Sequence, residues 1–463
     1  MTITNPLDLP EIRGALALFL TTSDLARCVR VCQDWYASFL PYLWSTLDIH
    51  TEKSKQPTLE ALQRHKDHVR HLHYRSEVPT DHRSIHFPAL KTLHFLQAVN
   101  SDNEMVRNHA SLTNVKLYGA YTRTFWNPQA ALSNLTSLIL FRVDIRLQDR
   151  NVVWSLFPQL ETLEVRGSSM MGIPQSATGN WKMKDLTLGW VGGFIPREQL
   201  RCIKMCPRLR RLAWMLSCPS ARHPVEEFTQ CMTAKTWPDL EELYIPLFRA
   251  TDRQITLMIS GMRHVHGLSV TCTEPFALVK KSLRPQFYCL RKWETASIFA
   301  ENTGFLMEIL KSCPQLESFK IGAVQVHDLV EDSSTPWACE RSLRELKVCI
   351  KASDTAGEME QRMFERLSRL RNLERLNLSS GMLLHSLGLC LGSGLEQLAT
   401  LTRLEELDFI NTVQKMTMKD VEWMIEHWKT LKDVRGRLNS EDETECQRMM
   451  ARFQEAGITA LQW

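Results

Sequence analysis

The chain has 463 residues, of which 44% are hydrophobic and 23% are charged. These values are typical of a folded globular protein and too apolar for a disordered one. The formal net charge of +4 is close to neutral for this length, so the sequence offers no broad basic footprint for nucleic acid or for an anionic membrane surface. We therefore expect no nucleic-acid partner and no membrane partner.

Thirteen cysteines are scattered along the chain without a C-x-x-C pair. Their odd number and the length of the chain are unlike the evenly paired cysteines of short secreted scaffolds. The apolar run 15–20 is too short for a signal sequence or a membrane span. These observations favour reduced thiols and a location in the cytoplasm, the nucleus or both.

The first predicted domain, residues 1–50, is a small all-α unit. Apolar residues recur at three- and four-residue spacing from Leu9 to Trp44, which predicts short amphipathic helices. The segment Thr22-Ser23-Asp24 predicts a turn and helix N-cap between them. A unit of this size buries little core by itself, so we expect it to pack against the rest of the chain or against a partner.

This segment resembles the F-box. The resemblance is carried by separated signatures whose order and gaps match the F-box pattern: Leu9-Pro10-Glu11-Ile12, Asp24-Leu25, Val31-Cys32-Gln33-Asp34-Trp35 and Leu43-Trp44. One departure is that no residue separates Pro10 from Glu11, so the first helix is expected to begin one residue early. The resemblance implies that an adaptor of the Skp type would be bound by Leu9, Pro10, Ile12, Leu25, Val31, Cys32 and Trp35. Packing within the three helices is the alternative role of Val31 and Trp35.

The second predicted domain, residues 51–438, is built from repeats. An L-x-x-L-x-L phrase returns about fifteen times from residue 69, at steps of 21 to 31 residues, close to the period of leucine-rich repeats. The last two apolar positions of each phrase alternate as in a strand with one buried face. The stretches 152–157, 306–311 and 359–370 have helical spacing and predict return helices.

One such repeat cannot bury its own apolar face, so the repeats are expected to stack. The predicted fold is α/β: the all-α F-box unit followed by a leucine-rich-repeat solenoid, with a curved parallel sheet and helices on its convex side. The third predicted domain, residues 439–463, is a capping helix with Asn439 or Ser440 as its N-cap and Gly457 as its stop.

Function is expected on the concave sheet face, at residues between the buried anchors. Tyr118, Phe141, Arg142 and Arg166 fall on or beside such positions in consecutive repeats. Tyrosine, phenylalanine and arginine are enriched at the centres of protein interfaces, so these four residues are the predicted substrate-binding patch. The alternative is an ordinary solvated surface.

Eight histidines lie between residues 65 and 109. In the strand interpretation, His71 and His73 share a face, and His94 takes the position of His73 one repeat later. Three nearby imidazoles could bind a metal or respond to pH. A polar surface without metal is the favoured interpretation, because no thiolate or carboxylate completes a ligand set.

The arrangement of box and repeats resembles F-box/leucine-rich-repeat proteins, in particular the fungal ones. The resemblance implies a substrate-recognition subunit of an SCF-type ubiquitin ligase: the box binds the Skp-type adaptor and through it a cullin–RING ligase, and the concave face binds a target protein for proteasomal degradation. The alternative is a repeat scaffold without a ubiquitin-ligase role. The chain lacks the common nucleotide-binding, zinc-protease and serine-hydrolase motifs, and Cys390 is interpreted as packing. We therefore expect no enzyme activity, no catalytic residues, no metal and no cofactor.

Overall fold

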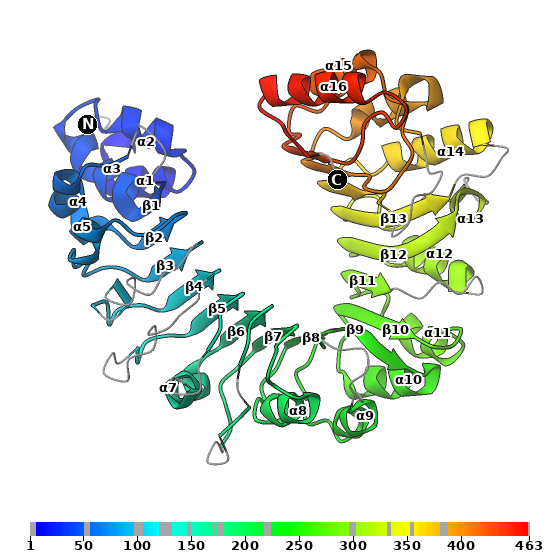
Figure 1. Cartoon of the computed structure of the whole chain (residues 1–463), viewed down its shortest axis with the longest axis horizontal. Helices are drawn as coiled ribbons and strands as arrows, with labels where there is room; N and C mark the ends of the chain where they lie inside the picture. The colour runs from blue at the N-terminus through cyan, green and yellow to red at the C-terminus, as the bar shows by residue number, and fades with distance from the viewer. Residues whose placement is uncertain are drawn as a thin grey trace. The chain divides into compact units, whose positions relative to one another are not determined.

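The computed structural model describes residues 6–50, 56–96, 105–106, 108–119, 132–145, 150–170, 172–174, 179–216, 224–295, 302–330, 335–351, 356–379 and 388–461. The chain divides into two compact units. The first unit comprises Met1–Leu209 and Leu216–Arg222, and the second comprises Arg210–Met215 and His223–Trp463. Figure 1 labels the elements of both units.

Three helices open the first unit: α1 (Pro10–Ala17), α2 (Thr22–Cys28) and α3 (Gln33–Ser45). Their small core consists of Ala17, Leu25 and Phe39, with Trp35 among the partly buried residues around it. The N-cap of α2 is Thr21, whose hydroxyl accepts from the Asp24 backbone N–H at 3.2 Å. The predicted cap at Thr22 to Asp24 was therefore wrong by one residue, and Thr22 is the first helical residue.

The first unit continues with a parallel sheet whose strands pair in chain order from β1 to β7. The strands are β1 (Thr46–Ile49), β2 (His71–Tyr74), β3 (Thr92–Phe95), β4 (Asn114–Tyr118), β5 (Ser137–Phe141), β6 (Thr162–Arg166) and β7 (Asp185–Gly189). The helices between and after them are α4 (Leu59–His65), α5 (Thr80–Arg83), α7 (Arg150–Leu156) and α8 (Pro196–Lys204), with 3₁₀ turns η1 (Pro6–Asp8), η2 (Lys66–His68) and η5 (Phe157–Gln159).

The second unit also contains a parallel sheet paired in chain order, from β8 to β17. Its strands are β8 (Arg211–Met215), β9 (Glu242–Ala250), β10 (Gly267–Cys272), β11 (Lys292–Thr295), β12 (Ser318–Gln325), β13 (Glu345–Lys351), β14 (Arg375–Asn377), β15 (Glu406–Asp408), β16 (Asp433–Arg435) and β17 (Thr459–Leu461). Its helices are α9 (Val225–Thr233), α10 (Asp252–Gly261), α11 (Leu278–Leu283), α12 (Thr303–Ser312), α13 (Val326–Val330), α14 (Ala356–Ser368), α15 (Met418–His427) and α16 (Glu443–Glu455), with 3₁₀ turns η6 (Arg284–Gln286), η8 (Leu391–Ser393) and η9 (Leu395–Thr400).

In several strands, buried residues alternate with partly exposed ones, as expected of a strand with one buried face. In β5 and β6 the burial pattern alternates, and Leu138 and Leu163 are essentially inaccessible to solvent. Their side chains lie on the sheet face that the return segments cover, and Figure 1 shows α7 and α8 on that side in the first unit and α10 to α13 on that side in the second. The residues between the anchors lie on the other sheet face, which we call the open face.

Buried polar side chains fasten neighbouring repeats to each other. Asn302 accepts the Phe276 backbone N–H through its Oδ1 at 2.7 Å, and the Asp252 carboxylate accepts the backbone N–H groups of Leu278 and Val279 at 2.6 and 3.0 Å. Each of these side-chain oxygens accepts a backbone N–H group of the adjacent repeat that would otherwise lack a hydrogen-bond partner. These hydrogen bonds explain why polar residues occupy core positions of the stack.

We expect Asn302→Ala to lower the free energy of unfolding of the second unit by about 1 to 3 kcal/mol, because the Phe276 N–H would lose its acceptor. Asn372 is the matched control, since its amide donates to the Arg341 carbonyl at an exposed site. Urea unfolding of Asn302→Ala and Asn372→Ala measures the difference. Equal stabilities of the two variants would contradict this role of Asn302.

The structure confirms a strand within each of the fifteen predicted phrases, and it corrects the two ends of the repeat region. Strand β1 lies inside the predicted box domain 1–50 and pairs with β2. At the other end, the segment 439–463 contains more than a capping helix: α16 begins at Glu443 with Asp442 as N-cap, and β17 follows and pairs with β16. The predicted caps Asn439 and Ser440 therefore lie before the helix, although Gly457 does follow its end with a positive φ.

Candidate protein-interaction surfaces

The N-terminal helices expose large apolar side chains. Phe19 is 85% exposed and Leu18 is 75% exposed, and further apolar side chains are open to solvent at Leu9, Ile12, Leu16 and Val31. Ile12 and Leu16 are one turn apart on α1 and share a face. We call these six residues the N-terminal apolar surface. Exposed apolar side chains at this density are typical of a surface that a partner covers.

The residues of the F-box resemblance separate into exposed and packed groups. Leu9, Pro10, Ile12, Val31 and Cys32 are exposed. Leu25 is buried in the helical core, and Trp35 packs beside it with its ring 5.4 Å from that of Phe39. The structure therefore corrects the contact role expected of Leu25, because its side chain is already covered by the helices themselves.

Ring side chains follow one another along the open face of the first unit. His73 and His94 lie 5.3 Å apart between ring centroids, His94 and Tyr118 lie 5.1 Å apart, and Tyr118 and Phe141 lie 5.5 Å apart. Each ring is half-buried and comes from the next strand, from β2 to β5. The parallel register places His73 opposite His94 and Tyr118 opposite Phe141.

The predicted substrate patch is only partly assembled. Arg142 follows β5 with a φ of 56° and its guanidinium lies 5.3 Å from the centre of the Phe141 ring. Arg166 lies opposite Phe141 in the register, but its Nε contacts the Glu164 carboxylate at 2.6 Å. Tyr118, Phe141 and Arg142 thus form one apolar and cationic surface, whereas the charge of Arg166 is engaged by its own strand.

Several of the histidines between residues 65 and 109 lie near one another. The predicted pairing of His73 with His94 is confirmed, and burial, together with the neighbouring His73 and Lys116, lowers the pKa of His94 to about 4. His109 is fully buried, and its Nε2 accepts the Phe87 backbone N–H at 2.9 Å while Nδ1 is hydrogen-bonded to the Met105 carbonyl. Among the residues that the structure describes, no group of histidine, cysteine and acidic side chains is arranged to hold a metal ion.

Acid should weaken the repeats around these histidines. Burial lowers the pKa of both His94 and His109 in the folded chain, so the unfolded chain binds protons first as the pH falls below about 6.5. The stabilisation is complete above that pH and is lost as the pH falls toward the folded pKa values. Hydrogen exchange at about pH 7 and about pH 5, corrected for intrinsic rates, should show lost protection in β2 to β4 before β11 to β14. Unchanged protection of β2 to β4 would contradict this expectation.

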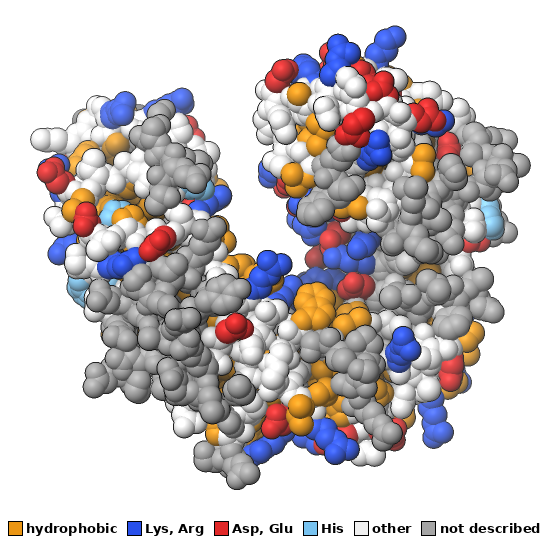
Figure 2. Space-filling model, viewed as in Figure 1, with side chains coloured by type: hydrophobic (Ala, Val, Ile, Leu, Met, Phe, Trp, Pro, Cys, Tyr) orange, Lys and Arg blue, Asp and Glu red, His pale blue; other side chains and the backbone are white. Residues whose placement is uncertain are grey.

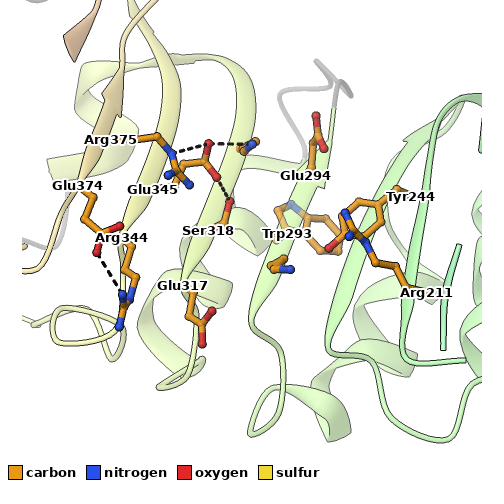
Figure 3. A pocket seen from close by; sticks show the side chains of 12 residues that line it. Arg211, Tyr244, Trp293, Glu294, Glu317, Ser318, Arg344, Glu345, Glu374 and Arg375 are labelled. Atoms are coloured by element: carbon orange, nitrogen blue, oxygen red, sulfur yellow. Dashed lines mark hydrogen bonds and ion pairs between the residues drawn. The ribbon is translucent and has the colours of Figure 1, made fainter. Parts of the chain in front are cut away.

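The second unit has a charged pocket on its open face, with a volume of about 300 Å³. Figure 2 shows Lys and Arg side chains with acidic side chains among them in this region, beside β11 to β13. Figure 3 shows the lining side chains from close by. They are Arg211, Tyr244, Lys292, Trp293, Glu294, Glu317, Ser318, Lys320, Arg344, Glu345, Glu374 and Arg375.

One end of the charged pocket is organised around Glu242. Its carboxylate lies 3.5 Å from Arg211 Nε and 3.3 Å from Lys292 Nζ, and it accepts the Tyr244 hydroxyl at 2.9 Å. Burial, together with the charge of Glu242, raises the pKa of Tyr244, so the phenol keeps its proton for this bond. Lys292 reaches Glu242 across β10 because Gly267 has no side chain: a Cβ there would lie 2.6 Å from the Tyr244 hydroxyl oxygen.

The other end repeats this arrangement around Glu345. Lys320 Nζ lies 2.8 Å from its carboxylate and Arg375 Nε lies 3.4 Å from it, while the Ser318 hydroxyl donates to it at 2.8 Å (Figure 3). Burial alone would raise the pKa of Glu345, but Lys320, Ser318 and Arg375 outweigh burial and leave the pKa below its usual value. Each end therefore holds one carboxylate between two cations and a hydroxyl.

The sequence contained a signal for this pocket that motif reasoning missed. Arg211, Glu242, Lys292, Glu345 and Arg375 all occupy the residue just before the second anchor of their repeats. Aligning the repeats on their anchors would have placed these alternating charges in one row across the strands.

Eight of the twelve cysteines that the structure describes are buried, whereas Cys32 is exposed. Burial raises the pKa of the Cys206 and Cys313 thiols, and both side chains are inaccessible to solvent. Cys390 is partly buried with its Sγ 3.1 Å from the Ser393 hydroxyl. Within the described ranges, no helix combines the length and the apolar character that crossing a membrane would need.

The similarity of this chain to known proteins is distant. No family model matches the sequence, and no curated protein matches it. Similar solved structures include the TLR13–ssRNA13 complex, with a TM-score of 0.40 and 14% identity over 83% of this chain and 58% of that one. Another is the leucine-rich-repeat ectodomain of the plant membrane receptor kinase GASSHO1/SCHENGEN3 from Arabidopsis thaliana in complex with CASPARIAN STRIP INTEGRITY FACTOR 2, with a TM-score of 0.29 and 12% identity over 82% of this chain and 52% of that one. A third is the plant peptide hormone receptor RGFR1 in complex with RGF2, with a TM-score of 0.28 and 15% identity over 79% of this chain and 64% of that one.

This chain spans between about half and two thirds of the length of those chains. Its own geometry establishes the architecture, because consecutive parallel strands carry the buried anchors of an L-x-x-L-x-L phrase. The fold of each unit is a leucine-rich-repeat solenoid. In each unit the return helices cover one sheet face. The open face of the first unit carries the ring side chains, and the open face of the second unit carries the charged pocket.

Proposed function

We propose that this leucine-rich-repeat chain is a protein-interaction scaffold that binds a partner on its open face. The supporting observation is the open face itself. Within each unit, its side chains come from consecutive strands at a spacing of about 4.8 Å, so they form a continuous surface there. They include the aromatic and arginine residues that dominate protein interfaces. Changing these side chains leaves the buried anchors in place, which allows a binding surface to vary without loss of the fold.

The patch formed by Tyr118, Phe141, Arg142 and Arg166 is the proposed substrate-binding surface. The Arg142 guanidinium over the Phe141 ring provides a rigid apolar and cationic anchor. We expect Phe141→Ala with Arg166→Ala to reduce capture of at least one partner protein several-fold in a quantitative interactome comparison. Thr162→Ala, in the same strand as Arg166, is the control. Retention of every partner at the wild-type level would place the binding site elsewhere.

The finer proposal is that the N-terminal helices form an F-box and that the chain is a substrate receptor of an SCF-type ubiquitin ligase. Its support is the N-terminal apolar surface, where Phe19, Leu18 and Val31 are exposed although the same helices bury Leu25 and Phe39. A helical unit that leaves several large apolar residues in water is suited to covering by an apolar adaptor surface. Leu9, Pro10, Ile12, Val31 and Cys32 are the proposed adaptor contacts.

Replacing Leu9 and Pro10 by Asp should abolish co-purification of a Skp-type adaptor and leave the fold intact, because both side chains are exposed. Burial of such apolar area is worth about 25 cal/mol per Å². Glu60→Ala, on a different helix of the same unit, is the control. Undiminished adaptor binding by the Leu9 and Pro10 variant would remove the ligase proposal and leave the scaffold proposal in place.

The chain is further proposed to bind its partners without catalysing a reaction on them, and to work in the cytoplasm, the nucleus or both. Support comes from the cysteines. Cys206 is held as a thiol that donates to the Cys202 carbonyl, and burial raises the pKa of buried thiols such as Cys313, which makes them poor nucleophiles. Such thiols fit a reducing compartment.

A further inference from the structure

We propose that the charged pocket of the second unit binds an extended acidic segment of a partner protein, with acidic side chains of the partner seated at its two ends. This inference rests on the proposed function, since it names the chemistry of a partner bound on the open face. It is carried by residues of β8 to β14, away from the predicted patch on β4 to β6.

The sign of the bound charge follows from the exposure of the pocket's own charges. The Glu242 and Glu345 side chains are only 20% exposed, whereas Arg211 and Arg375 are each 44% exposed. The carboxylates thus lie beneath the cations that contact them. At both ends the cations are therefore more exposed to solvent than the carboxylates they contact, while Glu294, Glu317 and Glu374 also line the pocket.

At each end of the pocket, two cations contact one carboxylate. One cation neutralises a carboxylate, but Glu242 contacts both Arg211 and Lys292, and Glu345 contacts both Lys320 and Arg375. Each of these two clusters therefore has one more cation than carboxylate, although the pocket as a whole, with Glu242, holds five cations and five carboxylates. Two cations held close together repel each other, and an arriving carboxylate would relieve that repulsion through charge-assisted hydrogen bonds.

The spacing of the two ends selects a peptide. Glu242 lies on β9 and Glu345 on β13, four strand steps apart, which corresponds to about 19 Å at a strand spacing of about 4.8 Å. An extended peptide covers that span in about six residues at about 3.3 Å per residue. Glu294 lies on β11 between the two ends and would repel a continuous polyanion, whereas a peptide can place an uncharged residue there.

The test uses the purified full-length chain and a fluorescein-labelled peptide of about ten residues, in which two Glu pairs are separated by about four Gly and Ser residues to match the span. The same peptide with Gln in place of Glu is the ligand control. The variant is Arg211→Gln with Arg375→Gln, which removes one cation from each end but leaves Lys292 on Glu242 and Lys320 on Glu345. Arg435→Gln, on β16 of the same unit, is the protein control.

We expect fluorescence anisotropy to show binding of the acidic peptide, weakening with added salt, and at least about a tenfold loss of affinity in the double variant, since contacts to charged groups are lost at both ends. The Arg435→Gln variant should bind the acidic peptide with unchanged affinity. The Gln peptide should not bind the wild-type chain. Hydrogen exchange of β8 to β14 confirms that the double variant is folded.

Three results would overturn the inference. The first is that the wild-type chain does not bind the acidic peptide. The second is that the double variant binds the peptide as tightly as wild type does. The third is that a single-stranded RNA of about twelve nucleotides binds more tightly through the same residues, which would indicate a polyanion site. If the peptide fails while partner capture still depends on Phe141 and Arg166, this inference alone is wrong. If capture is also unaffected, the proposed patch fails as well.

Discussion

Leu376→Ala is expected to lower the free energy of unfolding of the second unit by about 2 to 5 kcal/mol, because a large buried side chain would be replaced by a small one and a cavity would remain. Leu376 is the buried anchor of β14 and lies between Leu346 of β13 and Leu407 of β15 in the register. In a stack where each repeat contacts only its neighbours, the damage should stay near its origin. Hydrogen exchange should therefore rise most in β13 to β15.

Leu461→Ala is the matched control for this variant. Leu461 lies in β17 and is 41% exposed, so its loss should cost well under about 1 kcal/mol. An increase in exchange spread uniformly over the second unit in Leu376→Ala would contradict the stacked architecture. Equal losses in Leu376→Ala and Leu461→Ala would contradict the assignment of the anchors.

Gly261→Ala should cost about 1 to 3 kcal/mol or more, as overpacking of a tight contact does. Gly261 ends α10, and a Cβ at this position would lie 2.3 Å from the carbonyl oxygen of Met232 in α9. The obstacle is backbone, so the two helices would have to move apart. Thermal or urea unfolding of the full-length chain measures this loss.

Gly304→Ala provides the comparison within the same unit. Gly304 lies in the first turn of α12, and a Cβ there meets nothing within 4 Å. Alanine should stabilise this helix by up to about 1 kcal/mol, because glycine loses more backbone entropy on folding. The prediction for Gly261 would be wrong if both substitutions were neutral or stabilising.

The repeat architecture was predictable because the L-x-x-L-x-L phrase indicates both the position of each strand and the residues on its buried face. The strand at the N-terminal end was missed for a specific reason. Leu47 and Ile49 occupy the second and third anchor positions of the phrase in β1. The first anchor of that phrase is Trp44, which also belongs to the F-box pattern, so the phrase was not recognised as a repeat. At the C-terminal end, Ala460 is the buried anchor of β17, and alanine gives little apolar signal.

The candidate surfaces were harder to predict, because periodicity locates a residue on a face but does not show what covers it. Leu9 and Leu25 have the same chemistry and both belong to the F-box pattern, yet one is exposed and the other is core. The charged pocket depends on contacts between distant repeats: Lys292 and Glu242 are 50 residues apart and meet only because Gly267 lies between them. A motif read along one repeat contains no such information.

Site-specific photo-crosslinking tests the central claim, that partners bind the open face, most directly. A photoreactive phenylalanine analogue would replace Phe141 or Tyr118 on the open face, or Tyr288, an exposed aromatic residue in the return segment before β11. We predict covalent adducts with a partner protein from position 141 or 118 and none from position 288. Adducts from position 288 alone would place the interaction on the helix-covered side and contradict the proposed function.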